Sequence, residues 1–317
     1  MSQRVEYIGI DIACKHLDVQ FPEESRPARL PYDDKGLKSL TKRLPEGAHV
    51  VFESTAGYEV RLADHLAGLG ITYSQLNPRC VRDFARASGR LAKTDEIDAG
   101  VITRFAQALR PRPTVHSSEH LRILRRLVDR RDQLVAMRTA ERNRKHRSKH
   151  QQHDVSSNER MLKHIEEELE RIEAEIEAEL AQHEEHHAVV ERLKSTPGIS
   201  TATAVVLLTH LPELGTLDRR AIAKLVGVAP LNNDSGTRRG KQTTWGGRRR
   251  VRSALYMSVL VGIRYNPVIK DFYQRLVARG KPKKVAMTAA MRKLLVRLNA
   301  MIRDQATWSG APAQQLS

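Results

Sequence analysis

The stretch YIGIDIA, at residues 7–13, decides the fold of the N-terminal part of this chain, because a mainly apolar run there leads to a single acid, Asp11. A second run, in VVFEST, leads to Glu53. Short apolar runs bounded by polar residues predict buried strands, here at residues 5–10 and 49–52. Two acids that follow separate strands make up half of a candidate metal site.

Two further acids, Asp95 and Asp98 in KTDEID, open a stretch with helical spacing over residues 94–109. Residues three apart share one helix face. Mg²⁺ prefers carboxylate oxygens, and two such ions about 3.5–4 Å apart hold the attacking and leaving oxygens of a phosphodiester. Together the four acids predict a two-Mg²⁺ site of the ribonuclease H type, although each acid taken alone is more typical of a turn.

The composition predicts a polyanionic partner. The chain has 317 residues, a formal net charge of +17 and a pI of about 10.2. Basic side chains release counterions from phosphates, which favours DNA or RNA over the alternative of a merely soluble basic protein.

The sequence also predicts where the protein works. No apolar run is long enough to span a bilayer, and the N-terminus MSQRVEYIG is unlike a signal peptide. We therefore expect a cytoplasmic, nucleoid-associated bacterial protein with no membrane partner. Cys14 and Cys80 lack the spacing of a disulfide framework and are expected to be buried free thiols.

Three parts are predicted along the chain, α/β first and then helical. Residues 1–112 alternate strands and helices and predict a ribonuclease H-like α/β domain. Residues 113–190 predict an elongated helical connector, and residues 191–317 a mostly helical domain. Within the connector, apolar residues spaced by three or four predict a short coiled-coil seam: Leu162, Ile165, Leu169, Ile172 and Ile176. That seam predicts a hairpin that packs on itself or on another subunit.

Lysine and arginine gather in two stretches dense enough to predict contact with a phosphate backbone, although a charged face is often only solvated. Residues 138–149 carry six Lys/Arg against one Glu, and residues 238–252 carry seven among several glycines and no acid. An acidic stretch, residues 166–185 with ten Glu, is predicted to repel nucleic acid or to face a basic surface of a partner chain. The predicted nucleic-acid contacts are Arg142, Arg144, Lys145, Arg147, Lys149, Arg238, Arg239, Lys241, Arg248, Arg249, Arg250 and Arg252.

Two short motifs have competing interpretations. HEEHH at residues 183–187 matches the spacing of a zinc metalloprotease, with His183 and His187 as ligands. The segment has no apolar face and no evident third ligand, so solvated histidines are favoured. STPGI at residues 195–199 resembles a helix-hairpin-helix turn that contacts phosphate, and a plain packing corner between two helices is an equal alternative.

Several motifs in fixed order together resemble one family: GIDIA, FESTAGY, NP at residues 77–78, KTDEIDA, STPGI, the stretch GVAP…NDSG…RG…GG, and LYM. This is the IS110 family of insertion-sequence transposases, also called DEDD transposases or bridge recombinases. The resemblance implies a RuvC-like nuclease domain, a long helical connector and a C-terminal transposase domain with a nucleophilic serine. It implies that Asp11, Glu53, Asp95 and Asp98 bind the metal and that Ser235, in NDSG, is the nucleophile.

The resemblance further implies a structured noncoding guide (bridge) RNA that pairs with donor and target DNA, so that base pairing supplies sequence specificity. Recombination joins two DNA sites and cuts four strands, so a homo-oligomer, dimer or tetramer, is expected. Taken without the resemblance, Ser235 is typical of an Asp-Ser-Gly turn. Two other interpretations remain open: a structure-selective nuclease that uses water, like a Holliday-junction resolvase, and a non-catalytic nucleic-acid-binding scaffold.

Overall fold

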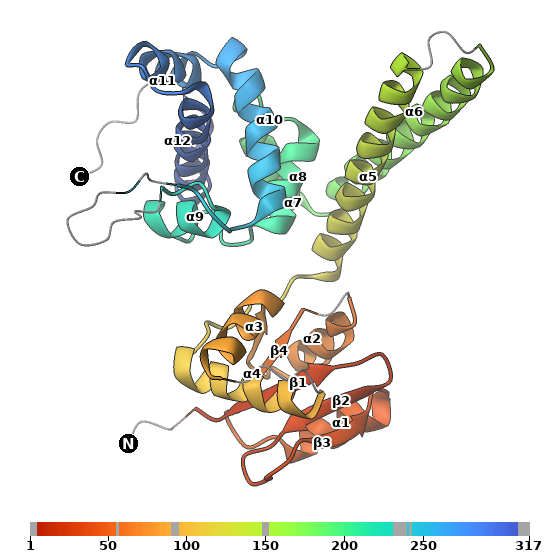
Figure 1. Ribbon diagram of the computed structural model, residues 1–317, viewed down its shortest axis with the longest axis vertical. Helices are drawn as coiled ribbons and strands as arrows, with labels where there is room; N and C mark the ends of the chain where they lie inside the picture. Colours follow the sequence, from red (N-terminus) through yellow and green to blue (C-terminus); the bar gives the residue numbers. More distant parts are fainter. Residues whose placement is uncertain are drawn as a thin grey trace. The chain divides into compact units, whose positions relative to one another are not determined.

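A computed structural model of the chain describes residues 5–54, 57–89, 95–147, 152–230, 240 and 243–309, without the side chains of residues 95–98 and 152–154. The chain forms two compact units, Met1–His116 and Ser117–Ser317. The first is a mixed α/β unit with one five-stranded sheet, and the second is helical (Figure 1). The expectation of an α/β part followed by a helical part is confirmed at this level.

The sheet of the first unit has the strand order β3-β2-β1-β4-β5. Strands β1, β2 and β3 pair antiparallel, whereas β4 pairs parallel with both β1 and β5. The strands and helices of this unit are β1 (Tyr7–Ile12), β2 (His16–Gln20), β3 (Ala28–Pro31), α1 (Asp34–Arg43), β4 (His49–Glu53), α2 (Glu59–Gly68), β5 (Tyr73–Leu76), α3 (Pro78–Ala87) and α4 (Asp95–Leu109).

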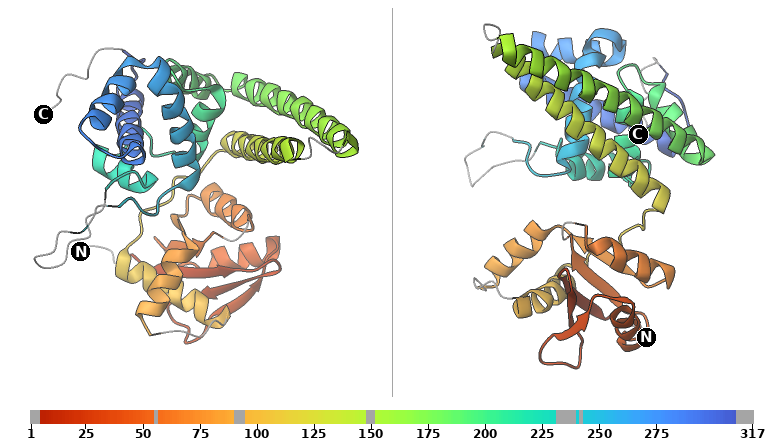
Figure 2. Two further views of the ribbon diagram at one scale, coloured as in Figure 1. Left: turned by 45° about the horizontal axis from the view of Figure 1, so that its top comes forward. Right: turned by 90° about the vertical axis from the view of Figure 1, so that its right-hand side faces the viewer.

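Helices cover both faces of this sheet. Because successive side chains of a strand point to opposite faces, Ile8 and Ile10 of β1 pack with α1 and α2, including Leu40 and Leu66. On the other face, Val51 of β4 belongs to a second core cluster with residues of α3 and α4. Figure 2 shows the sheet between the two helix pairs. Strand alternation places Asp11 and Glu53 on the face covered by α4.

The second unit begins with a long helical hairpin. Helices α5 (Glu119–Arg147) and α6 (Gln152–Ala181) run side by side in Figures 1 and 2. Near the middle of the hairpin, Ile165 and Leu169 of α6 are buried against Leu134 of α5. The predicted seam thus packs within its own hairpin, which is one of the two expected alternatives. Its use as an interface with another subunit stays a prediction.

The base of the hairpin is part of the C-terminal core. Leu124 of α5 and Ile176 of α6 are buried in one cluster with residues of the helices that follow. These helices are α7 (Glu184–Lys194), α8 (Thr201–His210), α9 (Arg219–Val226), α10 (Arg249–Tyr265), α11 (Pro267–Ala278) and α12 (Lys283–Arg303). The hairpin therefore belongs to the same compact unit as the C-terminal helices, and a boundary near residue 190 stays a prediction about domain organisation.

The turn in STPGI packs against α10. A Cβ on Gly198 would lie 2.8 Å from the carbonyl oxygen of Ser258, and Asn266 Nδ2 donates to the carbonyl oxygen of Pro197 at 3.3 Å. Ser200 caps α8 by accepting from the N–H of Thr203. The turn backbone is thus used in packing, which favours the packing corner over a phosphate-binding turn.

Three local expectations differ from the structure. Strand β1 extends through Ile12, so Asp11 lies within the strand rather than after it. Cys14 and Cys80 are both exposed, since they lie in the β1–β2 turn and in the first turn of α3. Strand β3 and helix α1 were not expected.

Over the described part of the chain, no helix combines the length and apolar character needed to cross a membrane.

Candidate active site and nucleic-acid-binding surfaces

Asp11 and Glu53 lie at the carboxyl ends of two neighbouring parallel strands. The register of β1 and β4 pairs Ile10 with Phe52, so the two acids occupy the next position on each strand. Both are half-buried. Ile10 and Phe52 point into the core beneath α1 and α2, so strand alternation directs both carboxylates to the opposite face, the one covered by α4.

A third acid on this face was not foreseen. Asp18 of β2 lies opposite Asp11 in the antiparallel pair and is only 3% exposed. Arg29 holds it through two hydrogen bonds of 2.8 Å, from Nε to Oδ1 and from Nη2 to Oδ2. Such a bidentate pair offsets the carboxylate charge. Asp18 is therefore committed to Arg29, and the sequence signal that could have found it is an acid inside the apolar strand HLDVQ.

Helix α4 lies directly on β1. The N–H of Gly9 donates to Thr103 Oγ1 at 2.9 Å, and a Cβ on Gly9 would lie 2.4 Å from the carbonyl oxygen of Ala99. Only glycine permits this approach. Earlier in β1, Tyr7 packs on the cluster that contains Phe105. The contacts therefore run in opposite chain directions: from Tyr7 toward Asp11 along β1, they move from Phe105 back toward the first turn of α4.

That first turn contains the other two predicted metal ligands. Helix α4 begins at Asp95, and Asp98 follows three residues later. Their side chains lie outside the described residues. The helix itself, antiparallel to β1, directs its N-terminal turn toward the strand end where Asp11 and Glu53 lie.

The predicted nucleophile, Ser235, lies outside the described residues, as do Lys149, Arg238, Arg239 and Lys241. The two ends of the loop that contains Ser235 are described. Gly227, with φ 79°, ends α9, and the N–H of Arg248 donates to the carbonyl oxygen of Leu225 at 3.1 Å. A Cβ on Gly247 would lie 2.3 Å from the backbone nitrogen of Gly227. The loop thus leaves the helical core and returns to it at one place.

At the start of α10, three of the arginines predicted to bind nucleic acid have partners within the protein. Arg248 pairs with Glu213 and donates to the carbonyl oxygen of His210 at 2.9 Å. Arg252 donates to the carbonyl oxygens of Val226 and Gly246. These contacts fix the start of α10 to the preceding helices.

Arg250 is the third of these arginines, and it connects α10 to α5. It pairs with Asp129, and its Nη2 lies 2.9 Å from Asp132 Oδ2 and 2.8 Å from the carbonyl oxygen of Val128. Arg249, between these paired residues, is exposed and makes no ion pair within the described part of the chain. Of the four arginines here, Arg249 is the one presented to solvent.

His210 lies beside this cluster and is held neutral. Its Nε2 is 3.2 Å from Asp129 Oδ1. Burial, followed by the charges of Arg125 and Arg250, lowers the pKa of His210 to about 3. Burial also raises the pKa of Asp129, against the opposing effect of Arg250. The contact between α5, α8 and α10 is therefore polar, half-buried and sensitive to protonation.

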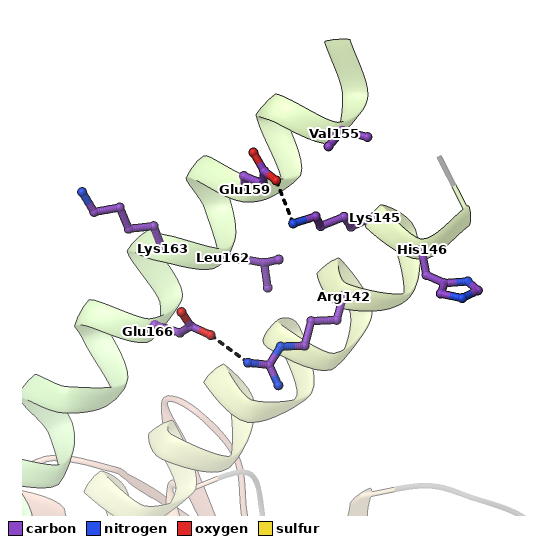
Figure 3. A pocket seen from close by; sticks show the side chains of 8 residues that line it. All are labelled: Arg142, Lys145, His146, Val155, Glu159, Leu162, Lys163 and Glu166. Atoms are coloured by element: carbon purple, nitrogen blue, oxygen red, sulfur yellow. Dashed lines mark hydrogen bonds and ion pairs between the residues drawn. The ribbon is translucent and has the colours of Figure 1, made fainter. Parts of the chain in front are cut away.

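At the far end of the hairpin, basic side chains of α5 meet acidic side chains of α6 (Figure 3). Lys145 Nζ lies 2.7 Å from Glu159, and Arg142 Nη2 lies 2.8 Å from Glu166. A groove of about 590 Å³ lies between the two helices here. The acidic stretch thus faces a basic helix of its own chain, and the expectation of a basic partner chain is not needed to explain it.

These ion pairs of the hairpin are exposed, so the basic side chains can exchange their carboxylate partners for water or phosphate. The side chains of Arg142 and Glu166 are 58% and 47% exposed, and ion pairs at such positions contribute little to stability. Arg144 pairs with Glu141 on its own helix, and Arg147 Nε lies 3.4 Å from the carbonyl oxygen of Asn143. Water or phosphate could replace the carboxylates at low cost, so this end of the hairpin remains a candidate contact for nucleic acid.

Two family models match the chain. A DEDD transposase model of the IS110 type matches residues 8–151, and a model of the IS116/IS110/IS902 transposase family matches residues 190–274. The pilin gene-inverting proteins of Moraxella bovis and Moraxella lacunata are each 26% identical over 311 residues, which cover 94% of this chain and 96% of the relative. An uncharacterized 43.6 kDa protein of insertion element IS110 from Streptomyces coelicolor is 32% identical over 142 residues, 44% of this chain and 34% of the relative.

Proposed function

We propose that this chain, which belongs to the IS110 family of transposases, cuts and rejoins donor and target DNA under the guidance of a structured RNA. Membership of that family makes it a DNA transposase, an enzyme that acts on DNA phosphodiester bonds. The proposal adds a metal site in the first unit, a serine nucleophile in the second, and a guide RNA. One observation supports it most: Asp11 and Glu53 lie at the carboxyl-terminal parts of neighbouring parallel strands, on the sheet face covered by the helix that begins with Asp95.

The first unit is proposed to have a ribonuclease H or RuvC-like fold. Three antiparallel strands followed by two parallel ones, with helices on both faces, are consistent with that layout. Within it, Asp11, Glu53, Asp95 and Asp98 are proposed to hold two Mg²⁺ ions. Half-buried carboxylates suit a hard cation, and the pairing of Asp18 with Arg29 limits the negative charge that accumulates there. When bound, the metal would stabilise charge on phosphate oxygens.

Ser235 is proposed as the nucleophile. Its hydroxyl oxygen would attack the scissile phosphorus and give up its proton to a base, and the bond from phosphorus to one deoxyribose oxygen would break. That oxygen leaves as an alcohol after it gains a proton. The phosphoserine ester keeps the energy of the broken bond, so a DNA hydroxyl can later attack it and release serine. The fixed loop ends at Gly227 and Gly247 support this role, because they anchor the loop that presents Ser235.

Nucleic acid is proposed to contact the exposed basic side chains. Arg249 on α10 and the far end of the hairpin, with Arg142 and Lys145, are available to phosphates. By contrast, Arg248 and Arg250 are proposed to position α10. Specificity would come from base pairing with the guide RNA, while these arginines and lysines contact the backbone.

Inversion is one outcome that such a recombinase could produce. The relatives that align over nearly the whole chain are named as pilin gene-inverting proteins. Cutting and rejoining two sites inverts the intervening DNA when the sites are oppositely oriented on one molecule. We propose that the same chemistry serves insertion or inversion here, depending on the arrangement of the sites.

A surface on α10 is suited to the proposed oligomer. Helix α10 presents a row of exposed apolar side chains at helical spacing: Tyr256, Met257, Leu260, Val261 and Tyr265. Exposed apolar patches of this kind mark interaction sites. Because recombination brings two DNA sites together, we propose that a second copy of this chain covers the row.

The decisive experiment is cleavage of labelled donor DNA in the presence of Mg²⁺ and the RNA that co-purifies with the protein. The wild type should form a covalent protein–DNA adduct, and Ser235→Ala should bind nucleic acid but neither cut nor form the adduct. Ser253→Ala, at an exposed position on α10, is the matched control. Cleavage by Ser235→Ala at the wild-type rate would make water the nucleophile, as in a resolvase. Absence of any cleavage by the wild type would favour a binding scaffold.

A further inference from the structure

Three histidines from separate positions in the chain meet at the base of the hairpin. His120 lies in the first turn of α5, His183 precedes α7, and His186 lies in its first turn. One ring nitrogen from each lies within 4.8 Å of those of the other two. The rings of His120 and His183 have centroids 3.7 Å apart, and those of His120 and His186 4.9 Å. Two glutamates contact the cluster, Glu179 at His120 and Glu185 at His186.

His120 is oriented for a ligand. Its side chain is 4% exposed, and its Nδ1 lies 2.9 Å from Glu179 Oε1 of α6. Hydrogen bonding to a carboxylate fixes the ring so that the other nitrogen is the free ligand atom. That atom, Nε2, is buried and has no hydrogen-bond partner. A buried polar atom without a partner costs free energy, so it needs an explanation.

His186 adds a second such atom. Its Nδ1 is also buried without a hydrogen-bond partner. Burial first, and then the neighbouring His120, lower the pKa of His186, although Glu185 opposes this. His183 is exposed, so its ring can rotate and solvent can reach the cluster. The cluster thus offers two buried ring nitrogens, from His120 and His186, and one from the exposed His183, whose side chain can reorient.

We infer that His120, His183 and His186 bind a divalent transition metal ion, with Zn²⁺ the best fit. Neutral imidazole suits Zn²⁺ and similar ions, whereas Mg²⁺ prefers oxygen ligands. Bonds of about 2.0–2.1 Å in a tetrahedral site place ligand nitrogens about 3.3 Å apart. The rings therefore need to close in, which rotation of His183 permits. Water from the exposed side completes the coordination.

The bound ion would cross-link the segments that meet at the base of the hairpin. It would join the start of α5 to the junction of α6 and α7, beside Leu124 and Leu180 of the shared core. Cross-linking distant segments stabilises the folded state, because the unfolded chain cannot keep the ligands together. The site is therefore structural, and it would set the direction of the hairpin relative to the C-terminal helices.

This arrangement differs from the metalloprotease pattern in the same stretch. That pattern uses His183 and His187, with Glu184 as the base. His187 is exposed and is not part of the cluster, and the third member comes from α5. His183 and His187, the two histidines expected to be solvated, are both exposed, whereas His186 is half-buried against His120.

The test is metal binding by the purified full-length protein. After stripping with chelator, loading with Zn²⁺ and dialysis, elemental analysis should find one Zn²⁺ per chain, and Co²⁺ should give the visible absorption of a tetrahedral site. His183→Gln and His186→Gln should each weaken Zn²⁺ affinity more than tenfold, while His187→Gln should not change it. Glu179→Gln should weaken it by about 10–100-fold, since Glu179 orients a ligand.

A second readout separates this site from the proposed catalytic one. Zn²⁺ should raise the melting temperature of the wild type and of Asp11→Asn equally, and Mg²⁺ at the same concentration should have no such effect. His183→Gln, at an exposed position, should fold normally yet lose the shift. Less than 0.2 Zn²⁺ per chain at saturation, or an equal loss of affinity in His187→Gln, would overturn the inference whatever the result of the cleavage assay.

Discussion

Gly247 and Gly227 are in backbone contact: a methyl group on Gly247 would lie 2.3 Å from the backbone nitrogen of Gly227. The contact closes the loop that contains Ser235, and both glycines have positive φ, at 72° and 79°. The two ends of this loop thus meet at a pair of glycines, where a larger residue would not fit.

Gly247→Ala should therefore abolish DNA cleavage while the helical core still folds. The added methyl group forces the loop ends apart, and the positive φ adds strain of about 1 kcal/mol. Gly246→Ala is the control, because Gly246 has φ 70° but nothing within 4 Å of an added Cβ. Cleavage and circular dichroism measured on both variants test the contact. Cleavage by Gly247→Ala at the wild-type rate would show that the contact between the loop ends is not required.

Asp11→Asn and Asp18→Asn should affect different properties: the first should affect DNA cleavage, and the second the stability of the fold. Asp11→Asn should remove cleavage while the free energy of unfolding falls less than in Asp18→Asn, because Asp11 is only half-buried. Asp18→Asn breaks the pair with Arg29 and should lower the free energy of unfolding by about 1–2 kcal/mol. Urea denaturation and cleavage assays measure both. A stable Asp18→Asn protein without activity would instead place Asp18 among the metal ligands.

Arg249→Ala should weaken binding of DNA and RNA of any sequence and reduce the salt slope by about one unit, because one phosphate contact is lost. Its melting temperature should stay unchanged. Arg248→Ala, one residue away, should lower the melting temperature because Glu213 loses its partner. Filter binding across a salt series, alongside thermal unfolding, distinguishes them. The assignment fails if Arg248→Ala reduces the salt slope as much as Arg249→Ala does.

His210 should make the protein less stable in mild acid. Its pKa is about 3 in the folded protein against 6.5 as the usual value, so between these values the unfolded chain binds the extra proton. The free energy of unfolding therefore falls as pH drops below about 6.5, by up to roughly 2 kcal/mol at pH 5. Asp129 has a raised pKa and acts in the opposite direction.

Comparison with His210→Gln isolates this contribution. Urea unfolding of both proteins at pH 7 and pH 5 should show a smaller loss of stability for the variant, because its side chain does not titrate. Other histidines contribute equally to both proteins. Identical losses would mean that His210 is not held neutral in the fold.

Replacing Met257 and Val261 with Lys should prevent oligomers from forming while leaving the melting temperature unchanged, since both side chains are exposed. Replacing Ile165 and Leu169 in the hairpin should instead lower stability, because both are buried against α5. Light scattering of the protein with RNA and DNA measures the mass. An unchanged mass for the Met257 and Val261 double variant would exclude this face as the interface between copies.

The sequence by itself determined the class of the fold and the family to which the chain belongs. Apolar runs leading to Asp11 and Glu53 identified two strands, since burial imposes a short apolar pattern that needs no distant contact to be seen. The helical spacing of residues 94–109 likewise identified α4 within one residue of its start. The order of the motifs identified the family.

Only the tertiary structure decided which charged and polar residues have partners. Arg248, Arg249 and Arg250 are identical in sequence terms, yet two of them pair with Glu213 and Asp129 from other helices and one faces solvent. His120 lies far along the chain from His186 and meets it only because α5 folds back along α6. Such pairings depend on distances between segments far apart in the chain, and local patterns of hydrophobicity and charge contain no information about them.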